Sequence, residues 1–180
     1  MIKKIKLQLF YILIWSFNFV HVLIMPMFFK KIIFYFARYE IGQNTSIQNV
    51  RFFSFGKLKV GNNCIINSGV YLDNRRGIEI GNNVVIAHDS KIYTLGHDFE
   101  DSNFITKGQP VKIEDYVIVF SNVLIMPGVI IKKGAVILPG SVVTKDVDEM
   151  CIVGGNPAIT IRKRNKLHTD KKVIHFWFAI

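Results

Sequence analysis

The sequence predicts a parallel β-solenoid, in which short strands separated by turns wind into stacked, three-sided coils. Three observations predict it. An aliphatic residue returns at every sixth position, the fifth position of each hexad is small or β-branched, and Gly-Asn-Asn and Pro-Gly turns recur at a fixed phase. An α-helix repeats every 3.6 residues and a flat strand every two, so neither gives this spacing. Repeating units that stack on their neighbours do give it.

The six-residue period is unbroken from residue 113 to 145 and continues upstream in shorter blocks. Three hexads close one coil of about eighteen residues, so the stacked coils are expected to bury a continuous aliphatic column. The positions expected to point inwards are Ile41, Ile47, Val60, Ile66, Leu72, Ile80, Ile86, Ile92, Ile113, Val119, Ile125, Ile131, Ile137 and Val143.

The period is interrupted in two places. The segment 74–79 adds two residues to one hexad, and the polar, irregular segment 95–112 separates two blocks of hexads. An insertion of this kind has to leave the coil as a loop, and loops inserted into solenoids commonly carry function. The longer one begins Gly96-His97-Asp98, which makes it the first place to look for a site.

The net charge of +10 is concentrated at the two ends of the 180-residue chain. Residues 1–39 carry six Lys or Arg and no acid, residues 40–160 carry eleven bases and twelve acids, and residues 161–180 carry six bases and one acid. This division predicts an apolar, basic helical segment over 1–39, the solenoid over 40–160 and a basic tail over 161–180. Basic ends on a near-neutral body favour anionic lipid or phosphate, and no nucleic-acid partner is expected. Cys64 and Cys151 fit no disulfide framework and are expected to stay reduced in the cytoplasm.

The amino-terminal segment has lysines, then about twenty mostly apolar residues, then Pro26 and two more lysines. The pattern is also that of a signal peptide, but the segment has no small-residue cleavage site after its apolar stretch. Three alternatives remain: a transmembrane helix over 7–29, two helices broken at Pro26 and lying in the membrane interface, or a helix packed on protein. We expect residues 1–38 to contact a membrane surface, and the polar residues within 7–29 weaken the case for a spanning helix.

The hexads, the loop TLGHDFE and the run GSVVTKDVDEMCIVGGNPAITIRKR resemble the hexapeptide-repeat acyltransferases over Ile41 to Arg164. Within that family the sugar, capsule and exopolysaccharide O-acetyltransferases are the most similar group. The resemblance implies a left-handed β-helix, acetyl-CoA as acyl donor, no metal, and direct transfer to a saccharide hydroxyl. The acceptor is expected to be a cell-surface polysaccharide precursor or a lipid-linked sugar, modified at the inner face of the membrane.

The resemblance also assigns roles to individual residues. His97 matches the catalytic histidine, and an imidazole with a pKa near 6.5 is a suitable general base for a hydroxyl. Asp98 either orients that ring or closes the loop. Asn67 matches an acceptor-binding asparagine, and Asp73 is a further candidate for contact with the acceptor.

Coenzyme A is expected to lie in a groove near the carboxyl-terminal coils. By resemblance, Ser121, Leu138, Pro139 and Gly140 line the groove, and Thr144, Lys145 and Arg162 lie near the adenosine phosphates. The chain departs from the family in having Ile118-Val119-Phe120 where Trp-Ile-Gly is usual, and Ile159 where some relatives have a basic residue.

The family forms trimers with active sites between subunits, so a homotrimer is expected. Two other functions stay open from the sequence. One is acyl transfer to the amine of an amino sugar, and the other is a non-catalytic solenoid that scaffolds a membrane assembly.

Overall fold

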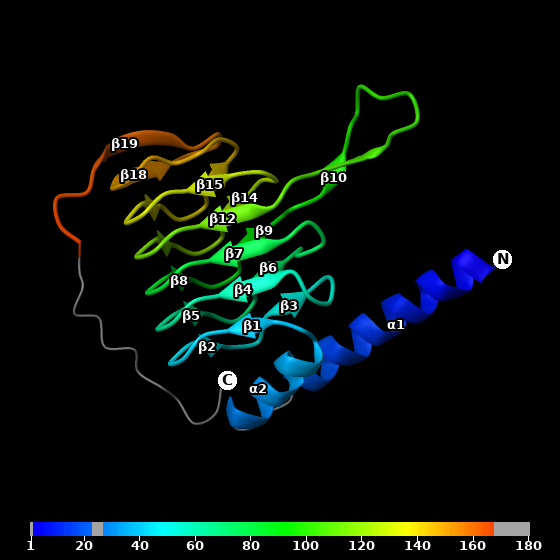
Figure 1. Ribbon diagram of the computed structural model, residues 1–180. Coiled ribbons are helices and arrows are strands. Elements are labelled where there is room, and N and C mark those ends of the chain that lie inside the picture. The colour runs from blue at the N-terminus through cyan, green and yellow to red at the C-terminus, as the bar shows by residue number, and fades with distance from the viewer. Residues whose placement is uncertain (1, 23–26, 168–180) are drawn as a thin grey trace.

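The six-residue period folds as predicted into a left-handed parallel β-helix, which the computed structural model presents as a stack of coils (Figure 1). The structure describes residues 2–22 and 27–167. Two helices, α1 (Ile2–Val22) and α2 (Met27–Phe36), precede the coils. The strands that follow are β1 (Glu40–Ile41), β2 (Ser46–Ile47), β3 (Arg51–Phe52), β4 (Leu58–Val60), β5 (Ile65–Ile66), β6 (Tyr71–Leu72), β7 (Ile78–Ile80), β8 (Val85–Ile86), β9 (Lys91–Ile92), β12 (Val111–Ile113), β13 (Ile118–Val119), β14 (Leu124–Ile125), β15 (Ile130–Ile131), β16 (Val136–Ile137), β17 (Val142–Val143), β18 (Cys151–Gly154) and β19 (Ile159–Lys163).

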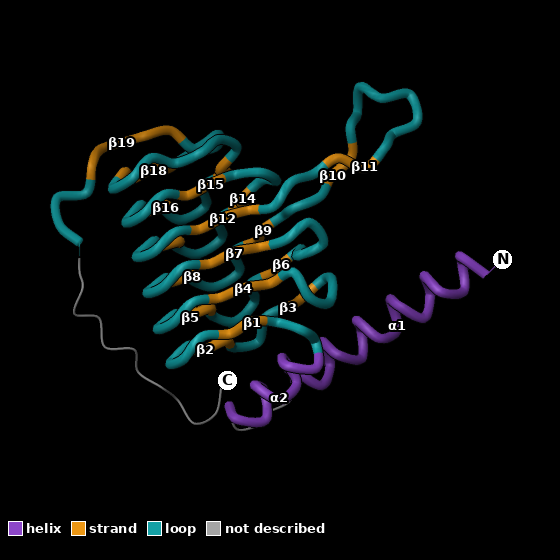
Figure 2. Tube along the Cα trace, in the orientation of Figure 1, coloured by secondary structure: helices purple, strands orange, loops and turns teal. Residues whose placement is uncertain are grey.

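Each coil gives one strand to each of three sheets, and these sheets form the three sides of a prism. Sheet I has the order β1-β4-β7-β12-β15, and sheet III has the order β17-β14-β9-β6-β3. Sheet II runs β18-β16-β13-β8-β5-β2, with β19 added antiparallel at its edge. Strands of successive coils pair in parallel, and short turns join the sheets at three corners (Figure 2).

The predicted inward residues form the core, except Ile41, which is half-buried and packs against it. In sheet II, Ile47, Ile66, Ile86, Val119 and Ile137 pair in register and are fully buried. Burying each such side chain contributes about 1.5–3 kcal/mol relative to leaving it in water. Their outward neighbours are more exposed, as expected for strands whose side chains alternate between faces.

Asparagines stack along the corner between sheets I and II. Asn62 accepts a hydrogen bond from the backbone N–H of Gln43 through Oδ1 at 2.7 Å, and Asn82 accepts one from the backbone N–H of Asn62 at 2.8 Å. Asp115 takes the same position in the next coil and accepts from the N–H of Asn82 at 2.7 Å. The repeated Gly-Asn-Asn sequence is therefore a ladder that joins consecutive coils.

The insertions fall at the corner between sheets III and I. The connections from β3 to β4, β6 to β7 and β9 to β12 pass this corner and cover residues 53–57, 73–77 and 93–110. The four-residue turns of the corner between sheets I and II keep one length from β1 to β16. The sequence located the 74–79 slip and the 95–112 loop, and the structure places both at one edge of the prism.

The helices cover the amino-terminal end of the solenoid. Asn18 of α1 donates from Nδ2 to the carbonyl of Phe52 at 2.8 Å and accepts from the N–H of Phe52 at 2.8 Å. The rings of Phe17 and Phe34 lie 5.7 and 5.9 Å from that of Phe52. An open strand edge invites further pairing, and here α1 covers it.

At the other end, β19 folds back on β18 and continues the sheet into residues predicted as a basic tail. Arg164 binds the carbonyls of Gly134 and Tyr116 through Nη1, at 3.1 and 3.4 Å. This arginine is therefore committed to the last coils. The remainder of the tail, 168–180, and the break predicted at Pro26 lie outside the described residues.

Over the described residues, neither α1 nor α2 is both long enough and apolar enough to cross a lipid bilayer.

Candidate active site

The longest insertion forms a hairpin that stands away from the coils. Its paired strands are β10 (Gly96–His97) and β11 (Thr106–Lys107), and His97 faces Thr106 in the antiparallel register. In Figure 1 the hairpin and α1 both extend to the right of the stacked coils. The predicted catalytic histidine is thus presented on a loop with its own backbone pairing.

The imidazole of His97 is exposed and held in one orientation. Its Nδ1 lies 2.8 Å from the carbonyl oxygen of Phe104, and its ring stacks on the ring of Phe104 at 4.4 Å with an interplanar angle of 5°. A carbonyl oxygen can only accept, so Nδ1 must carry the proton of this hydrogen bond. In the neutral ring, Nε2 is then left with its lone pair, which is the form that a general base requires.

Asp98 takes part in closing the loop. Its Oδ2 lies 2.9 Å from Nζ of Lys107, and its Oδ1 accepts from the backbone N–H of Glu100 at 3.2 Å. The bond to Lys107 and then the backbone bond lower the pKa of the Asp98 carboxyl. The sequence left open whether Asp98 orients the His97 ring or closes the loop, and its contacts with Lys107 and Glu100 are those of a residue that closes the loop. Phe104 and Lys107 were not predicted, and an aromatic residue within a polar loop is the sequence feature that could have indicated the first.

The two predicted acceptor residues lie at different corners. Asp73 is fully buried beside the departure of the loop, and its carboxylate pairs with Arg75 at 2.7 and 2.8 Å. Its carbonyl accepts from Thr94, the last residue before the predicted loop, at 2.6 Å. Asn67 follows β5 at the corner between sheets II and III, half-buried. Within one chain, the width of sheet III separates it from the base of the loop.

The predicted coenzyme A residues fall into three places. The backbone N–H of Gly140 donates to the carbonyl of Ser121 at 3.0 Å, so the turn of residues 138–140 lies directly on the turn of the previous coil. At Gly140 a Cβ atom would meet nothing within 4 Å, which leaves open space beside this turn. Thr144 and Lys145 are exposed at the far end of β17, and Arg162 is exposed on β19.

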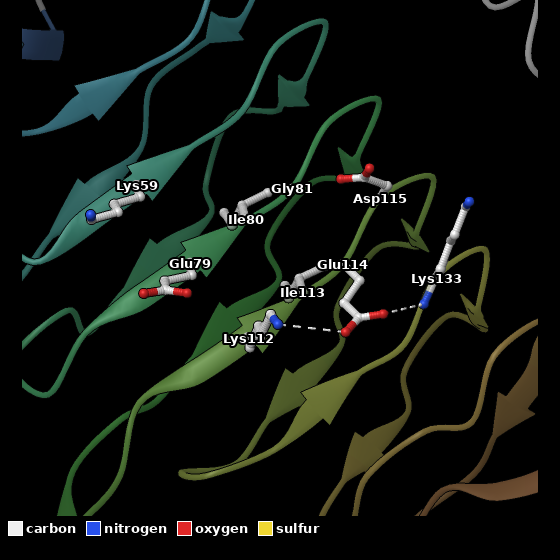
Figure 3. A pocket seen from close by; sticks show the side chains of 9 residues that line it. All are labelled: Lys59, Glu79, Ile80, Gly81, Lys112, Ile113, Glu114, Asp115 and Lys133. Carbon is white, nitrogen blue, oxygen red and sulfur yellow. Dashed lines mark hydrogen bonds and ion pairs between the residues drawn. The ribbon is translucent and has the colours of Figure 1, made fainter.

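A shallow pocket of about 460 Å³ lies on sheet I and contains none of the predicted site residues (Figure 3). Its charged groups serve the fold. Glu114 pairs with Nζ of Lys112 at 3.6 Å and accepts from the backbone N–H of Lys133 at 3.0 Å. Asp115 belongs to the corner ladder. We interpret this surface as a hydrated, charged side of the prism.

Within the described part of the chain, no three His, Cys, Asp or Glu side chains come together in a way that could hold a metal ion.

Comparison with known proteins identifies the family of the chain. The family model for the bacterial transferase hexapeptide (six repeats) matches residues 110–145. The structure of a maltose O-acetyltransferase from Clostridium difficile 630 is 30% identical, covers 85% of this chain and 85% of its own, and has a TM-score of 0.77. The chain belongs to the hexapeptide-repeat acetyltransferases. The predicted family and the predicted enzyme class, acyltransferase, are confirmed.

Two further members of known structure are similar to this hexapeptide-repeat acetyltransferase. One from Vibrio cholerae O1 biovar eltor, solved with acetyl coenzyme A, is 25% identical over 85% of this chain and 86% of its own, with a TM-score of 0.79. A galactoside acetyltransferase in complex with coenzyme A is 24% identical over 91% and 88% of the two chains, with a TM-score of 0.76, and shows the shared fold. No curated protein matches the chain.

The structure places the two departures from the family pattern that the sequence indicates, one after β13 and the other on β19. Phe120 stands where glycine is usual and exposes 41% of its surface beside Ser121. Ile159, in place of a basic residue, exposes 67% of its surface on β19. The fold accommodates both residues at the surface.

Proposed function

We propose that this enzyme transfers the acetyl group of acetyl-CoA to a hydroxyl of a saccharide, with His97 as the general base. The observation that carries the proposal is the Nδ1 hydrogen bond to Phe104, which leaves Nε2 of an exposed imidazole as an acceptor. The acetyl coenzyme A bound to the Vibrio cholerae relative and the maltose O-acetyltransferase from Clostridium difficile support the donor and the acceptor class. A cell-surface polysaccharide precursor is the proposed acceptor.

The reaction then runs in two steps. Nε2 removes the proton of the acceptor hydroxyl as its oxygen attacks the thioester carbonyl, forming the C–O bond and a tetrahedral oxyanion. The oxyanion collapses, the C–S bond breaks, and the leaving thiolate takes the proton from the imidazolium. The carbonyl of Phe104 accepts from Nδ1–H throughout, so it stabilises the cationic ring between the two steps.

The exposed cations at the carboxyl-terminal end suit the phosphates of the donor. Lys145 and Arg162 carry charge there, and Thr144 supplies a hydroxyl. The open turn at Gly140 suits the extended pantetheine arm, because no side chain obstructs it. We expect the exposed ring of Phe120 to border this arm.

A homotrimer is proposed from the outward rows of the three sheets. Sheet I presents alternating charges, with Glu40, Lys59, Glu79 and Lys112 in register. Sheet II presents an aliphatic row, which is better suited to a subunit contact because burying it leaves no charge without a partner. That row consists of Ile65, Val85, Ile118, Val136 and Ile152. Light scattering should give about three times the 20.7 kDa of one chain.

We also propose that the helices lie on the cytoplasmic surface of an anionic membrane. Lys4, Lys6, Lys31 and Arg38 are exposed, and residues 1–39 contain no acid to oppose them. Exposed apolar side chains lie among these cations, a combination typical of interfacial helices. The most exposed are Ile12, Leu13, Trp15, Phe19, Tyr35 and Phe36.

The general-base role is tested by His97→Ala, with His88→Ala as the matched control. His88 is also exposed, on the turn between β8 and β9. The expected result is a fall in kcat of about 10²–10⁴-fold for His97→Ala and little change for His88→Ala, with both variants keeping the thermal stability of the parent. The acceptor panel should include sugars, amino sugars and lipid-linked glycans. Undiminished turnover by His97→Ala would exclude His97 as the base.

A further inference from the structure

A groove of about 670 Å³ runs between α1 and the first coil. Its α1 wall is aromatic: Trp15 and Phe19 are stacked at 6.0 Å and expose 69% and 59% of their surface. The two hydrogen bonds between Asn18 and Phe52 hold this wall against the coil. Apolar surface of this kind, kept open in a fixed position, suits a hydrocarbon chain.

One buried polar atom borders this groove. Oδ1 of Asn49 is buried and accepts no hydrogen bond from the part of the chain that the structure describes. Leaving such an atom without a partner costs free energy, so this end of the groove is less well satisfied than the rest of the coil.

The groove continues onto sheet III through a residue that lines both parts. Arg51 borders the apolar groove and also a second hollow of about 380 Å³, lined by Tyr71, Lys91, Tyr93 and Gly69. Arg51, Tyr71 and Lys91 face each other in register on successive strands. The guanidinium of Arg51 lies 5.8 Å from the centre of the Tyr71 ring, and the Tyr71 and Tyr93 rings lie 5.6 Å apart.

This row combines two exposed cations with two aromatic rings. Neither Arg51 nor Lys91 forms an ion pair with an acid among the described residues. Of the neighbouring acids, Asp73 pairs with Arg75 at 2.7 Å, and the carboxylate of Asp89 lies against Gly69 at the edge of the second hollow. The cations Arg51 and Lys91 are therefore available to a phosphate. The tyrosine rings offer flat apolar faces with hydroxyl groups, a surface on which a sugar ring can lie.

The order of these surfaces gives the ligand its chemistry. An apolar groove comes first, and Arg51, Tyr71 and Lys91 follow on successive strands, with the ring of Tyr93 beside that of Tyr71. Tyr93 is followed in the chain by Thr94 and the hairpin that carries His97. We propose that this track binds the acceptor, and that the acceptor is a saccharide linked through phosphate to a lipid chain. The inference rests on the proposed function and specifies its substrate class.

The track and the expected coenzyme A groove do not compete. The apolar groove and the second hollow are lined by α1 and the first three coils. The residues expected to hold coenzyme A lie on β19, directly after β17 and in the turns after β13 and β16, all of them in the later coils. Donor and acceptor would thus approach the hairpin from opposite ends of the solenoid.

Titration calorimetry of the full chain with decyl phosphate, below the concentration at which it forms micelles, tests the track. Inorganic phosphate and decanol serve as partial ligands. The variant Arg51→Gln/Lys91→Gln removes both cations, and Lys59→Gln/Lys112→Gln removes the same charge from sheet I. We expect decyl phosphate to bind more tightly than either partial ligand, and the first variant to raise its Kd at least tenfold. The sheet I variant should leave that Kd unchanged.

Three outcomes would overturn the proposal: no binding of decyl phosphate, equal weakening by both double variants, or equal binding of decanol and decyl phosphate. The acyltransferase function is measured separately, by acetyl-CoA binding and by acetylation of free sugars by the parent enzyme. If these succeed while decyl phosphate does not bind, the track fails and the proposed function stands. If both fail, the proposed function has failed as well.

Discussion

Replacing Ile78 with alanine tests the inward column at the centre of sheet I, and its neighbour Glu79 supplies the control. Ile78 is fully buried on β7, whereas Glu79 is exposed between the strands of Lys59 and Lys112. At about 0.8 kcal/mol per buried carbon group, Ile78→Ala forfeits about 2.4 kcal/mol of transfer free energy. The cavity left behind raises the expected loss to about 3–4 kcal/mol. Glu79→Ala removes one exposed charge, and the expected change in the free energy of unfolding is about 1 kcal/mol or less.

Urea unfolding followed by circular dichroism, at one fixed protein concentration, measures both losses. With a slope of about 2–3 kcal/mol per molar urea, Ile78→Ala should lower the midpoint by about 1–2 M and Glu79→Ala by less than about 0.5 M. A strand shifted by one residue would exchange the two faces and with them the two results. Equal shifts, or a larger one for Glu79→Ala, would therefore refute the assigned register.

Three further predictions concern the end cap, a corner and the hairpin. Lys30 is fully buried with no hydrogen-bond partner for Nζ among the described residues, and burial lowers the pKa of its ammonium group. Between that lowered pKa and the ordinary value of 10.5, the unfolded chain binds more protons than the folded chain, so the free energy of unfolding should rise with pH across this window. Lys30→Met should remove this pH dependence and raise the free energy of unfolding at pH 7. Gly61→Ala should lower the melting temperature, because its Cβ would lie 2.6 Å from the carbonyl oxygen of Gly81, whereas Gly96→Ala, with nothing within 4 Å, should not. Phe104→Ala removes the ring that stacks on His97, so it should lower kcat and leave the KM for acetyl-CoA nearly unchanged. Phe104→Tyr keeps the ring and should restore kcat. If Phe104→Ala has the kcat of the parent, the stack is not needed for catalysis.

The hexads were sufficient to predict the coils because each position sees the same surroundings in every turn. Ile66, Ile86 and Val119 occupy equivalent places in successive coils, so the sequence repeats the same signal in every coil. The Gly-Asn-Asn turns were likewise predictable, since each asparagine repeats the contact of the one before it. Where Asp115 replaces asparagine, its Oδ1 supplies the same acceptor.

The contacts that occur once were not predictable from the pattern. The six-residue period does not indicate that Asn18 both donates to and accepts from the backbone of Phe52 at the edge of β3, because Asn18 lies in a helix outside the repeat. The hairpin was located by its polarity, but the stack of His97 on Phe104 depends on the pairing of β10 with β11. The outward row of Arg51, Tyr71 and Lys91 was hidden for another reason. The six-residue period constrains the inward positions and leaves the outward residues beside them free to vary.

The end cap and the acceptor track share one element, which couples stability to binding. α1 covers the open edge of β3 through Asn18, and the same helix supplies Trp15 and Phe19 to the groove. A ligand that binds the native form alone stabilises it by mass action. Occupation of the groove should therefore hold α1 on the first coil, and Asn18→Ala should weaken both the cap and the binding of decyl phosphate. A solenoid whose end is closed by its substrate site would be most stable when its acceptor is present.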